Sequence, residues 1–291
     1  MDLARSLMFV PGHRGRMVEK ALALATLDVA LLDLEDGVPP AEKDNARTLL
    51  GDVLARSGGD RPRRFVRVNA VTSDRFRSDV AAVIGPGCHG LLLPKVESTD
   101  QLRAADGVVA AEERTRGLAA GAIVVIVAIE SGLGLLRAHE IASASARVVG
   151  LMFGGEDYAN DLGLPTDRQG EARELVHGRA SMIVAAAAAR VQSFDGVWPT
   201  IGDAEGLRRD SVQARRLGFT GKSLIHPGQI DIINEVFTPS ETDLDYARRV
   251  VAAFDEARAR GDGAIAFGGQ LIDLPIVERA RRVIGLWEST R

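Results

Sequence analysis

Eight short apolar runs recur along the chain and alternate with segments of helical periodicity. The runs are Ser6–Val10, Val29–Leu34, Phe65–Val68, Gly90–Leu93, Ile123–Ile129, Val148–Phe153, Gly196–Trp198 and Lys222–Ile225. A strand that is buried on both faces reads as a continuous apolar run, and such strands belong to parallel sheets. Eight strand and crossover units match the count of the TIM (β/α)8 barrel. The pattern therefore predicts an α/β fold of this type.

The segments between the runs predict the helices of this barrel. They are Arg16–Leu27, Ala41–Arg56, Ser98–Glu113, Leu133–Ala144, Glu171–Arg190 and Ala204–Leu217. Ser98 or Thr99, and Asp203, are suited to cap the helices that follow them. A doubly wound open sheet is the alternative, but it normally carries a glycine-rich phosphate loop after its first strand. The stretch at residues 11–15 contains no such motif.

The pattern changes after residue 239. Ser240–Arg260 reads as a helix, a glycine-rich link follows, and Pro275–Trp287 reads as a last helix with proline at its first position. We expect residues 1–239 to form the barrel and residues 240–291 to form a C-terminal helical extension. This extension would pack on the barrel or on a neighbouring subunit.

Composition narrows the class of protein. The net charge is −4 and no dense basic block is present, which argues against nucleic-acid binding. No apolar stretch approaches the roughly 20 residues of a membrane span, and the N-terminal run is too short for a signal peptide. Cys88 is the single cysteine, so no intrachain disulfide can form. We expect a cytoplasmic protein without a membrane partner.

Acidic residues follow two consecutive apolar runs. Glu130 closes the run that ends at Ile129, and Asp157 comes shortly after the run that ends at Phe153. In α/β barrels the chemistry collects at the carboxyl ends of the strands. Mg²⁺ prefers oxygen ligands, keeps several waters and uses only one or two protein carboxylates. The two acids therefore predict a Mg²⁺ site with open positions for a substrate.

Other charged residues fall at the same predicted rim. Arg67 ends the third run, and its guanidinium suits a substrate carboxylate or a developing enolate oxygen. Glu35 and Asp36 follow the second run, and Lys95 follows the fourth. Buried charge at one rim is costly unless it is paired or bound to a metal. The rim is therefore predicted to be a polar site.

Each of these residues also has a purely structural interpretation. Glu130 could cap the following helix, Asp157 could cap a turn, and Arg67 could be half of a structural ion pair. For most of the three acids Asp33, Glu35 and Asp36 we favour pairing with Arg5 or Lys95, as supporting residues, over a direct catalytic role. His226 before proline is read as structural. The remaining histidines have no zinc-ligand spacing, and Cys88 is read as inert.

Eight sequence blocks, in order, resemble the citrate lyase β-subunit-like family, also called HpcH/HpaI aldolases, which includes malyl-CoA and citramalyl-CoA lyases. The blocks are Arg5–Gly12, Leu32–Asp36, Val66–Asn69, Leu93–Glu97, Ala128–Glu130, Gly155–Asp157, Gly218–Pro227 and Ile272–Pro275. Each block alone is a weak signal, but eight in the family's order are specific. Together they cover residues 5 to about 280.

The resemblance implies a barrel of the phosphoenolpyruvate/pyruvate type that binds Mg²⁺ and forms homotrimers or hexamers. It implies that Glu130 and Asp157 bind Mg²⁺, that Arg67 contacts the substrate, and that Asp273 is an acid/base that reaches a neighbour's active site. The leading hypothesis is cleavage or formation of a β-hydroxyacyl-CoA, which yields a 2-oxo acid and an acyl-CoA.

Three alternatives stay open at this point. The first is a class II aldolase that acts on a free hydroxy-oxo acid without CoA. The second is a citrate lyase β-subunit that works within a complex. The third is a non-catalytic regulator that binds CoA or metal, although the intact carboxylate pair argues against it.

Overall fold

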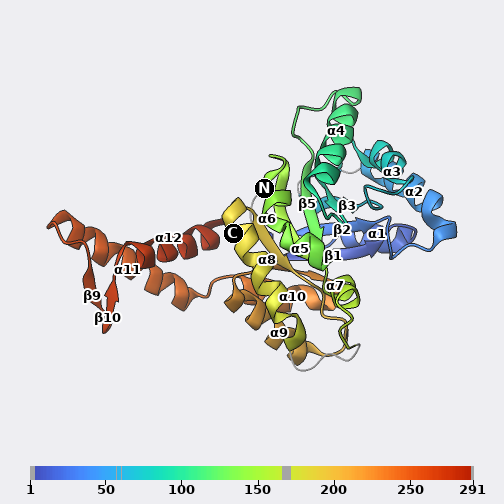
Figure 1. Cartoon of the computed structure of the whole chain (residues 1–291). Helices are drawn as coiled ribbons and strands as arrows, with labels where there is room; N and C mark the ends of the chain where they lie inside the picture. The colour runs from blue at the N-terminus through green and yellow to red at the C-terminus, as the bar shows by residue number, and fades with distance from the viewer. Residues whose placement is uncertain (1–3, 57, 60, 166–171, 290–291) are drawn as a thin grey trace. The chain divides into compact units, whose positions relative to one another are not determined.

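Eight parallel strands close into a barrel in the computed structural model, which describes residues 4–56, 58–59, 61–165 and 172–289. The strands are β1 (Ser6–Pro11), β2 (Val29–Asp33), β3 (Arg63–Arg67), β4 (Gly90–Leu93), β5 (Val124–Ile129), β6 (Val148–Phe153), β7 (Gln192–Asp195) and β8 (Gly221–Leu224). Each strand pairs with its sequence neighbours, and β1 pairs with β8 to complete the circle. Figure 1 shows the strands at the centre of the barrel and the helices around them. The predicted barrel is confirmed.

Strand β7 is the one strand whose predicted position is wrong. The sequence predicted Gly196–Trp198, whereas the structure places the strand at Gln192–Asp195. The apolar pattern misled here because Gln192 and Ser193 are polar strand residues. The side-chain hydroxyl of Ser193 donates to the backbone carbonyl of Gly218 (3.3 Å). The corrected register puts Asp195 at the carboxyl end of β7, one residue before the predicted strand.

Helices follow the strands and cover the barrel. They are α1 (Gly15–Leu22), α2 (Lys43–Arg56), α3 (Phe76–Val83), α4 (Thr99–Thr115), α5 (Gly132–Leu136), α6 (Ala138–Ser143), α7 (Gly155–Asp161), α8 (Val176–Ala189), α9 (Ala204–Leu217) and α10 (Ile230–Phe237). Short 3-10 turns occupy Pro40–Glu42, Arg173–Leu175 and Pro227–Gln229. The predicted helix at 171–190 begins at Glu171, which lies outside the described residues.

Two of the predicted helix caps are confirmed by hydrogen bonds. The side chain of Ser98 accepts from the backbone N–H of Gln101 at the start of α4, and that of Asp203 accepts from Gly206 at the start of α9. Each bond satisfies a backbone donor that has no partner within its helix. Helices α3, α7 and α10 were not predicted, because seven or eight residues span too few turns for an apolar period to stand out.

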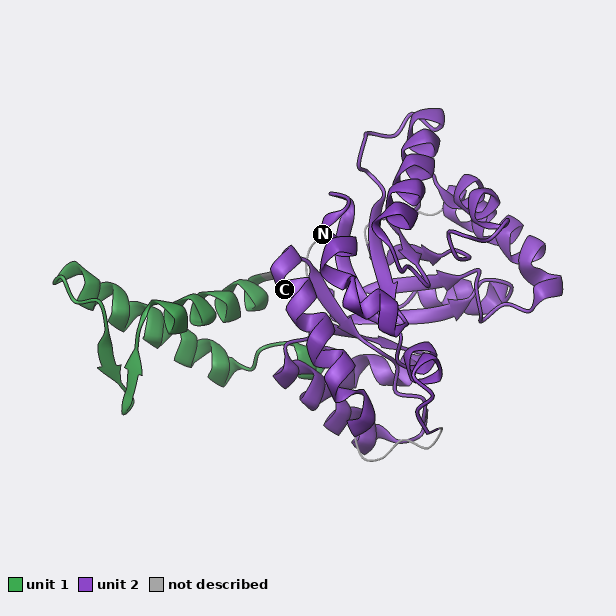
Figure 2. Cartoon of the chain, viewed as in Figure 1, with its two compact units in different colours: residues 1–3, 235–291 green, residues 4–234 purple. Residues whose placement is uncertain are grey.

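The chain divides into two compact units, residues 4–234 and residues 235–291, which Figure 2 shows in purple and green. The predicted boundary between residues 239 and 240 falls inside the second unit. The second unit contains α11 (Glu241–Ala259), a hairpin of β9 (Ile265–Phe267) and β10 (Gln270–Ile272), and α12 (Leu274–Ser289). The hairpin occupies the stretch that the sequence had suggested was only a link.

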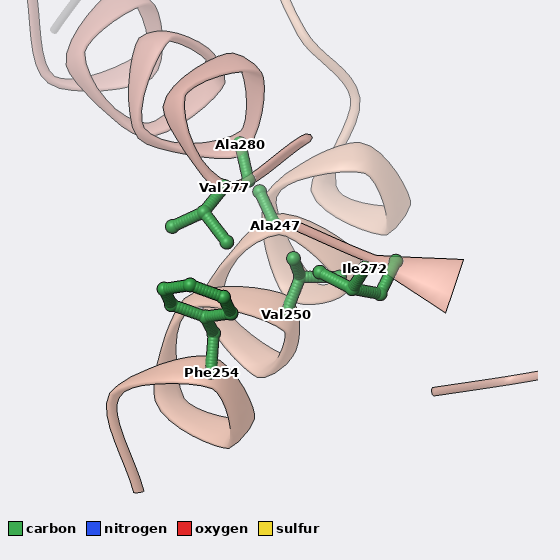
Figure 3. Packing of buried hydrophobic residues seen from close by; sticks show 6 residues of the cluster. All are labelled: Ala247, Val250, Phe254, Ile272, Val277 and Ala280. Carbon is green, nitrogen blue, oxygen red and sulfur yellow. The ribbon is translucent and has the colours of Figure 1, made fainter. Parts of the chain in front are cut away.

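The second unit has its own apolar core. Val250 and Phe254 of α11 pack with Ile272 of β10 and with Val277 of α12, and all four are buried (Figure 3). A capping box at Ser240 starts α11: its side chain accepts from the N–H of Asp243, whose carboxylate accepts from the N–H of Ser240. This core fixes the place of Asp273, which lies between β10 and α12.

No helix in the part of the chain that the structure describes is long and apolar enough to cross a membrane.

Candidate active site

A cavity of about 380 Å³ opens at the carboxyl ends of the barrel strands. Phe9, Asp33, Arg67, Glu130, Met152 and Asp157 are among the residues that line it. They come from β1, β2, β3 and β6, from the position just after β5 and from the first turn of α7. The barrel thus brings Glu130, Asp157 and Arg67 to one cavity. The sequence predicted that these residues would meet at the carboxyl ends of the strands.

Glu130 directly follows β5 and is almost fully buried, with 8% of its surface exposed. Its Oε2 accepts a hydrogen bond of 2.8 Å from the backbone N–H of Lys95. The alternative that Glu130 caps the next helix is wrong, because Ser131 is the N-cap of α5 and its side chain accepts from Gly134. The carboxylate is therefore available to the cavity.

Glycine at position 154 makes room for the Glu130 side chain. A Cβ atom at this position would collide with Cγ of Glu130 and would lie 2.8 Å from its Oε1. Gly154 is the residue between β6 and α7, so the end of one strand is shaped around the acid that follows the neighbouring strand. The Glu130 carboxylate is held by its surroundings on both sides.

Asp157 lies in the first turn of α7, after Gly155 and Glu156. Negative charge is favourable at this end of a helix. Burial and, after it, the nearby charge of Asp157 together raise the pKa of Glu130 to about 7. A buried carboxylate whose ionisation is opposed by its burial and by a neighbouring carboxylate is the arrangement that a bound cation relieves.

The residues present fit a Mg²⁺ ion. Within the described part of the chain, neither Glu130 nor Asp157 forms a salt bridge, because the cations beside them are paired with other acids. The part of the chain that the structure describes contains no group of three or more His, Cys, Asp or Glu side chains that could form a closed protein cage. Mg²⁺ needs no such cage, since one or two carboxylates plus water and substrate oxygens complete its coordination.

Arg67 is fixed at the end of β3 by a two-point contact. Its Nε and Nη2 each donate to a different oxygen of Asp33, both at 2.7 Å, and its Nη1 lies 3.2 Å from Oε2 of Glu35. Its guanidinium also lies 4.8 Å from the centre of the Phe9 ring. Burial alone would lower the pKa of Arg67, but the hydrogen bonds and charge of Asp33 raise it above its usual value. Arg67 is thus a permanent, oriented cation in the cavity wall.

The predicted supporting residues divide into two groups. Lys95 pairs with Glu35 (2.6 Å) and Asp36 (2.9 Å), as the sequence suggested. Arg5 does not join them: it precedes β1, at the opposite end of the strand from the cavity, and pairs with Asp28 at 2.9 Å. The predicted pairing of Arg5 with the acids of β2 is therefore wrong, because the carboxyl end of β2 faces the other rim.

Sequence reasoning missed a buried ion network beside the cavity. Arg179 of α8 and Lys222 of β8 each pair with both Asp195 and Asp210, at distances up to 3.1 Å. None of the four is more than 3% exposed. Burial would raise the pKa of Asp195, but Lys222 and Arg179 hold it below its usual value. The signal available in the sequence was Lys222, a lysine inside an apolar strand. Its partner Asp195 was missed because β7 was predicted at the wrong residues.

Asp273 lies in the second compact unit, where its backbone carbonyl accepts from the N–H groups of Ile276 and Val277 at the start of α12. It is partly buried.

His226 caps the short turn after β8 by accepting from Gly228, and burial raises the pKa of Cys88 to about 12. Both agree with the structural roles that the sequence suggested.

The fold is an α/β barrel, and its cavity carries a pair of carboxylates that fit a divalent cation. A family model described as HpcH/HpaI aldolase/citrate lyase matches residues 5–227. The chain belongs to this family, whose members are Mg²⁺-dependent lyases. The predicted family, barrel fold, enzyme class and cofactor are confirmed.

Individual relatives cover nearly the whole chain. The citrate lyase subunit beta of Leuconostoc mesenteroides is 37% identical and covers 98% of this chain and 93% of its own. A (3S)-malyl-CoA thioesterase of Cereibacter sphaeroides is 35% identical, with 98% and 95% covered. The protein CitE of Mycobacterium tuberculosis, solved with magnesium, acetoacetate and coenzyme A, is 32% identical, covers 98% of both chains and has a TM-score of 0.79.

Proposed function

We propose that this protein is a Mg²⁺-dependent carbon–carbon lyase that cleaves or forms a β-hydroxyacyl-CoA such as malyl-CoA or citramalyl-CoA. The observation that carries the proposal is the convergence of Glu130, Asp157 and the fixed guanidinium of Arg67 on one cavity. Relatives named malyl-CoA lyase and malyl-CoA thioesterase, and a solved relative with coenzyme A, support the substrate class. We place the activity in the cytoplasm.

Glu130 and Asp157 would hold the metal. When bound, Mg²⁺ supplies a Lewis acid for the carboxylate and carbonyl oxygens of a 2-oxo acid. Glu130 lines the cavity, and its Oε2 is held by the Lys95 amide. The protein fixes the direction of the carboxylate before any ligand arrives, which is the preorganisation that catalysis needs.

The reaction in the cleavage direction is a retro-aldol step. The bond between the α- and β-carbons of the thioester breaks, the β-hydroxyl loses its proton to become the carbonyl of the 2-oxo acid, and the electron pair passes to the thioester as an enolate. Arg67 would stabilise the enolate oxygen, because its guanidinium stays charged and oriented. Protonation of the α-carbon then gives the acyl-CoA, so that the proton lost by the hydroxyl is balanced by the proton gained at carbon.

Asp273 is our candidate for the proton transfer at the α-carbon. The support is its place in the Ile272–Pro275 block that resembles the family, on a segment held by its own core. We propose that the chain forms a homotrimer or hexamer in which Asp273 serves a neighbour's site. The test mixes two inactive variants, Asp273→Asn and Glu130→Gln. Recovery of activity on mixing supports a shared site, and no recovery in a mixed oligomer contradicts it.

The assay of the proposed activity incubates the protein with malyl-CoA and with citramalyl-CoA in the presence of Mg²⁺. We expect release of a 2-oxo acid together with an acyl-CoA. Release of free thiol in addition to the 2-oxo acid would show that the thioester is also hydrolysed. A folded protein that cleaves neither thioester, with or without Mg²⁺, contradicts the proposal. Cleavage of a free hydroxy-oxo acid instead would favour the class II aldolase alternative.

A second candidate function is that of a citrate lyase β-subunit within a complex. The observation that favours it is the full-length similarity to the Leuconostoc subunit. Activity of the purified chain alone on free CoA thioesters supports the first proposal. A chain that is inactive alone but active together with the other subunits of such a complex supports the second.

A further inference from the structure

Lys95 has a strained backbone at the rim of the cavity. It follows β4 by two residues and has a φ of 56°, which is uncommon for a residue other than glycine. In the described part of the chain, only Ala172 and Arg190 share this feature among non-glycine residues. A left-handed residue persists where its surroundings hold it, and such residues gather at functional sites.

The left-handed turn gives the Lys95 amide a specific acceptor. Its N–H donates to Oε2 of Glu130 at 2.8 Å. The backbone that follows β4 is thus hydrogen-bonded to the acid that follows β5, and β4 and β5 are neighbouring strands of the barrel. A hydrogen bond to one carboxylate oxygen restricts rotation of the group and so restrains the other oxygen, Oε1.

The side chain of the same residue orders a second part of the site. Its Nζ donates to Oε1 of Glu35 (2.6 Å) and to Oδ2 of Asp36 (2.9 Å). The other oxygen of Glu35 faces Nη1 of Arg67 at 3.2 Å. Lys95 is therefore connected through Glu35 to the guanidinium of Arg67 as well as, through its amide, to Glu130.

We propose that Lys95 is a positioning residue with two separable roles. Its left-handed amide aims the Glu130 carboxylate for metal binding, and its ammonium, through Glu35, steadies Arg67 for the substrate. The inference rests on the proposed function, since it assumes that Glu130 binds Mg²⁺ and that Arg67 meets the substrate. It assigns to one lysine the alignment of both groups.

The backbone role is tested with four substitutions that all remove the ammonium: Lys95→Gly, Lys95→Asn, Lys95→Met and Lys95→Val. Gly adopts a positive φ freely, Asn tolerates it, and a β-branched residue resists it. The readout is the Kd for MgCl₂ alone, by calorimetry. We expect affinity to fall in the order Gly, Asn, Met, Val, with about a tenfold loss from Gly to Val. Equal affinities in folded variants overturn this role, and if Val fails to fold, the Gly, Asn and Met series still decides.

The side-chain role is tested with Lys95→Gly and Lys95→Arg. We expect Lys95→Gly to keep Mg²⁺ affinity within about threefold of the wild type, because glycine adopts the positive φ that aims the amide, but to lower kcat/KM for the thioester about tenfold. Lys95→Arg should restore most of that kcat/KM. In a Glu35→Gln background, the effect of Lys95→Gly should largely disappear, because the connecting carboxylate is already neutral. An unchanged kcat/KM in Lys95→Gly contradicts this role.

One further variant separates a failure of this inference from a failure of the proposed function. If Glu130→Ala binds Mg²⁺ as the wild type does, the metal site itself is misassigned. If Glu130→Ala abolishes binding while the Lys95 series shows no ordered change, the site stands and the positioning role of Lys95 is wrong.

Discussion

Arg67 and Asp33 are joined by two parallel hydrogen bonds of 2.7 Å between the ends of β3 and β2. The contact holds the plane of the guanidinium in one orientation and leaves its third nitrogen toward Glu35. It shows that the structural interpretation of Arg67, an ion pair, and the functional one are compatible. The pair is how the barrel aims a cation into the cavity.

The first prediction concerns this two-point contact. A lysine at position 67 keeps the charge but cannot form the fork. We expect Arg67→Lys to lower kcat/KM for the CoA thioester by about 100-fold, the usual size of losing one aligned donor. Arg103→Lys is the control, since Arg103 makes an exposed contact of 3.5 Å with Asp100. Activity of Arg67→Lys within about threefold of the wild type would contradict the assigned role.

The second prediction concerns the space beside Glu130. A methyl group at position 154 would collide with the Glu130 side chain and move its carboxylate. We expect Gly154→Ala to lose about 100-fold in activity and to weaken Mg²⁺ binding in calorimetry. The matched control is Gly107→Ala in α4, where a Cβ meets nothing within 4 Å and should stabilise the helix by about 0.5–1 kcal/mol. Wild-type Mg²⁺ affinity in Gly154→Ala would argue against Glu130 as a ligand.

The third prediction concerns pH. The folded pKa of Glu130, about 7, lies above its usual value of 4.5, so the metal-free folded state binds this proton more tightly than the unfolded state. The associated stability is present below pH 4.5 and is lost as pH rises through about 7, by roughly 3 kcal/mol at most. We expect Glu130→Gln to abolish this loss in thermal unfolding with a chelator present.

Mg²⁺ provides the complementary measurement for the same titration. The ion requires the deprotonated carboxylate, so it should raise the melting temperature of the wild type more at pH 8 than at pH 5.5. Glu130→Gln should show little rise at either pH. A Mg²⁺ effect in the wild type that does not change with pH would show that Glu130 does not titrate at the metal site.

The fourth prediction concerns the buried network of α8, β7, β8 and α9. Removal of the Lys222 ammonium leaves Asp195 and Asp210 with a single buried cation. We expect Lys222→Met to destabilise the protein by about 3–5 kcal/mol in urea unfolding. Arg103→Met, at an exposed pair, should change stability by less than about 0.5 kcal/mol. Similar losses in both variants would show that the network contributes nothing specific.

Much of the barrel could be predicted because its strands are buried on both faces. The run at Val148–Phe153, for example, was predicted with the bounds that the structure shows. Strand β7 could not be predicted in the same way, because Gln192 and Ser193 satisfy their polar groups through contacts from distant segments. The hairpin of β9 and β10 has three residues in each strand, too few for an alternating pattern to be read.

The site shows the same division. Glu130, Asp157 and Arg67 could be placed at one rim, because parallel strands put their carboxyl ends together. The ion-pair partners of Arg5 and Arg67 could not be predicted from the sequence. The choice among Asp28, Asp33 and Glu35 depends on which end of the barrel each acid occupies. The left-handed backbone of Lys95 has no sequence signal, because lysine is not a residue that prefers that conformation.

The central claim is that Glu130 and Asp157 hold the Mg²⁺ ion that this protein needs to break a carbon–carbon bond. The most direct test measures acyl-CoA release from malyl-CoA or citramalyl-CoA as Mg²⁺ is titrated into the metal-free wild type, Glu130→Gln and Asp157→Asn. The account predicts saturable activation of the wild type and little activity in either variant at any Mg²⁺ concentration. Cleavage by the wild type that needs no divalent cation, or full activity of both variants, would contradict it.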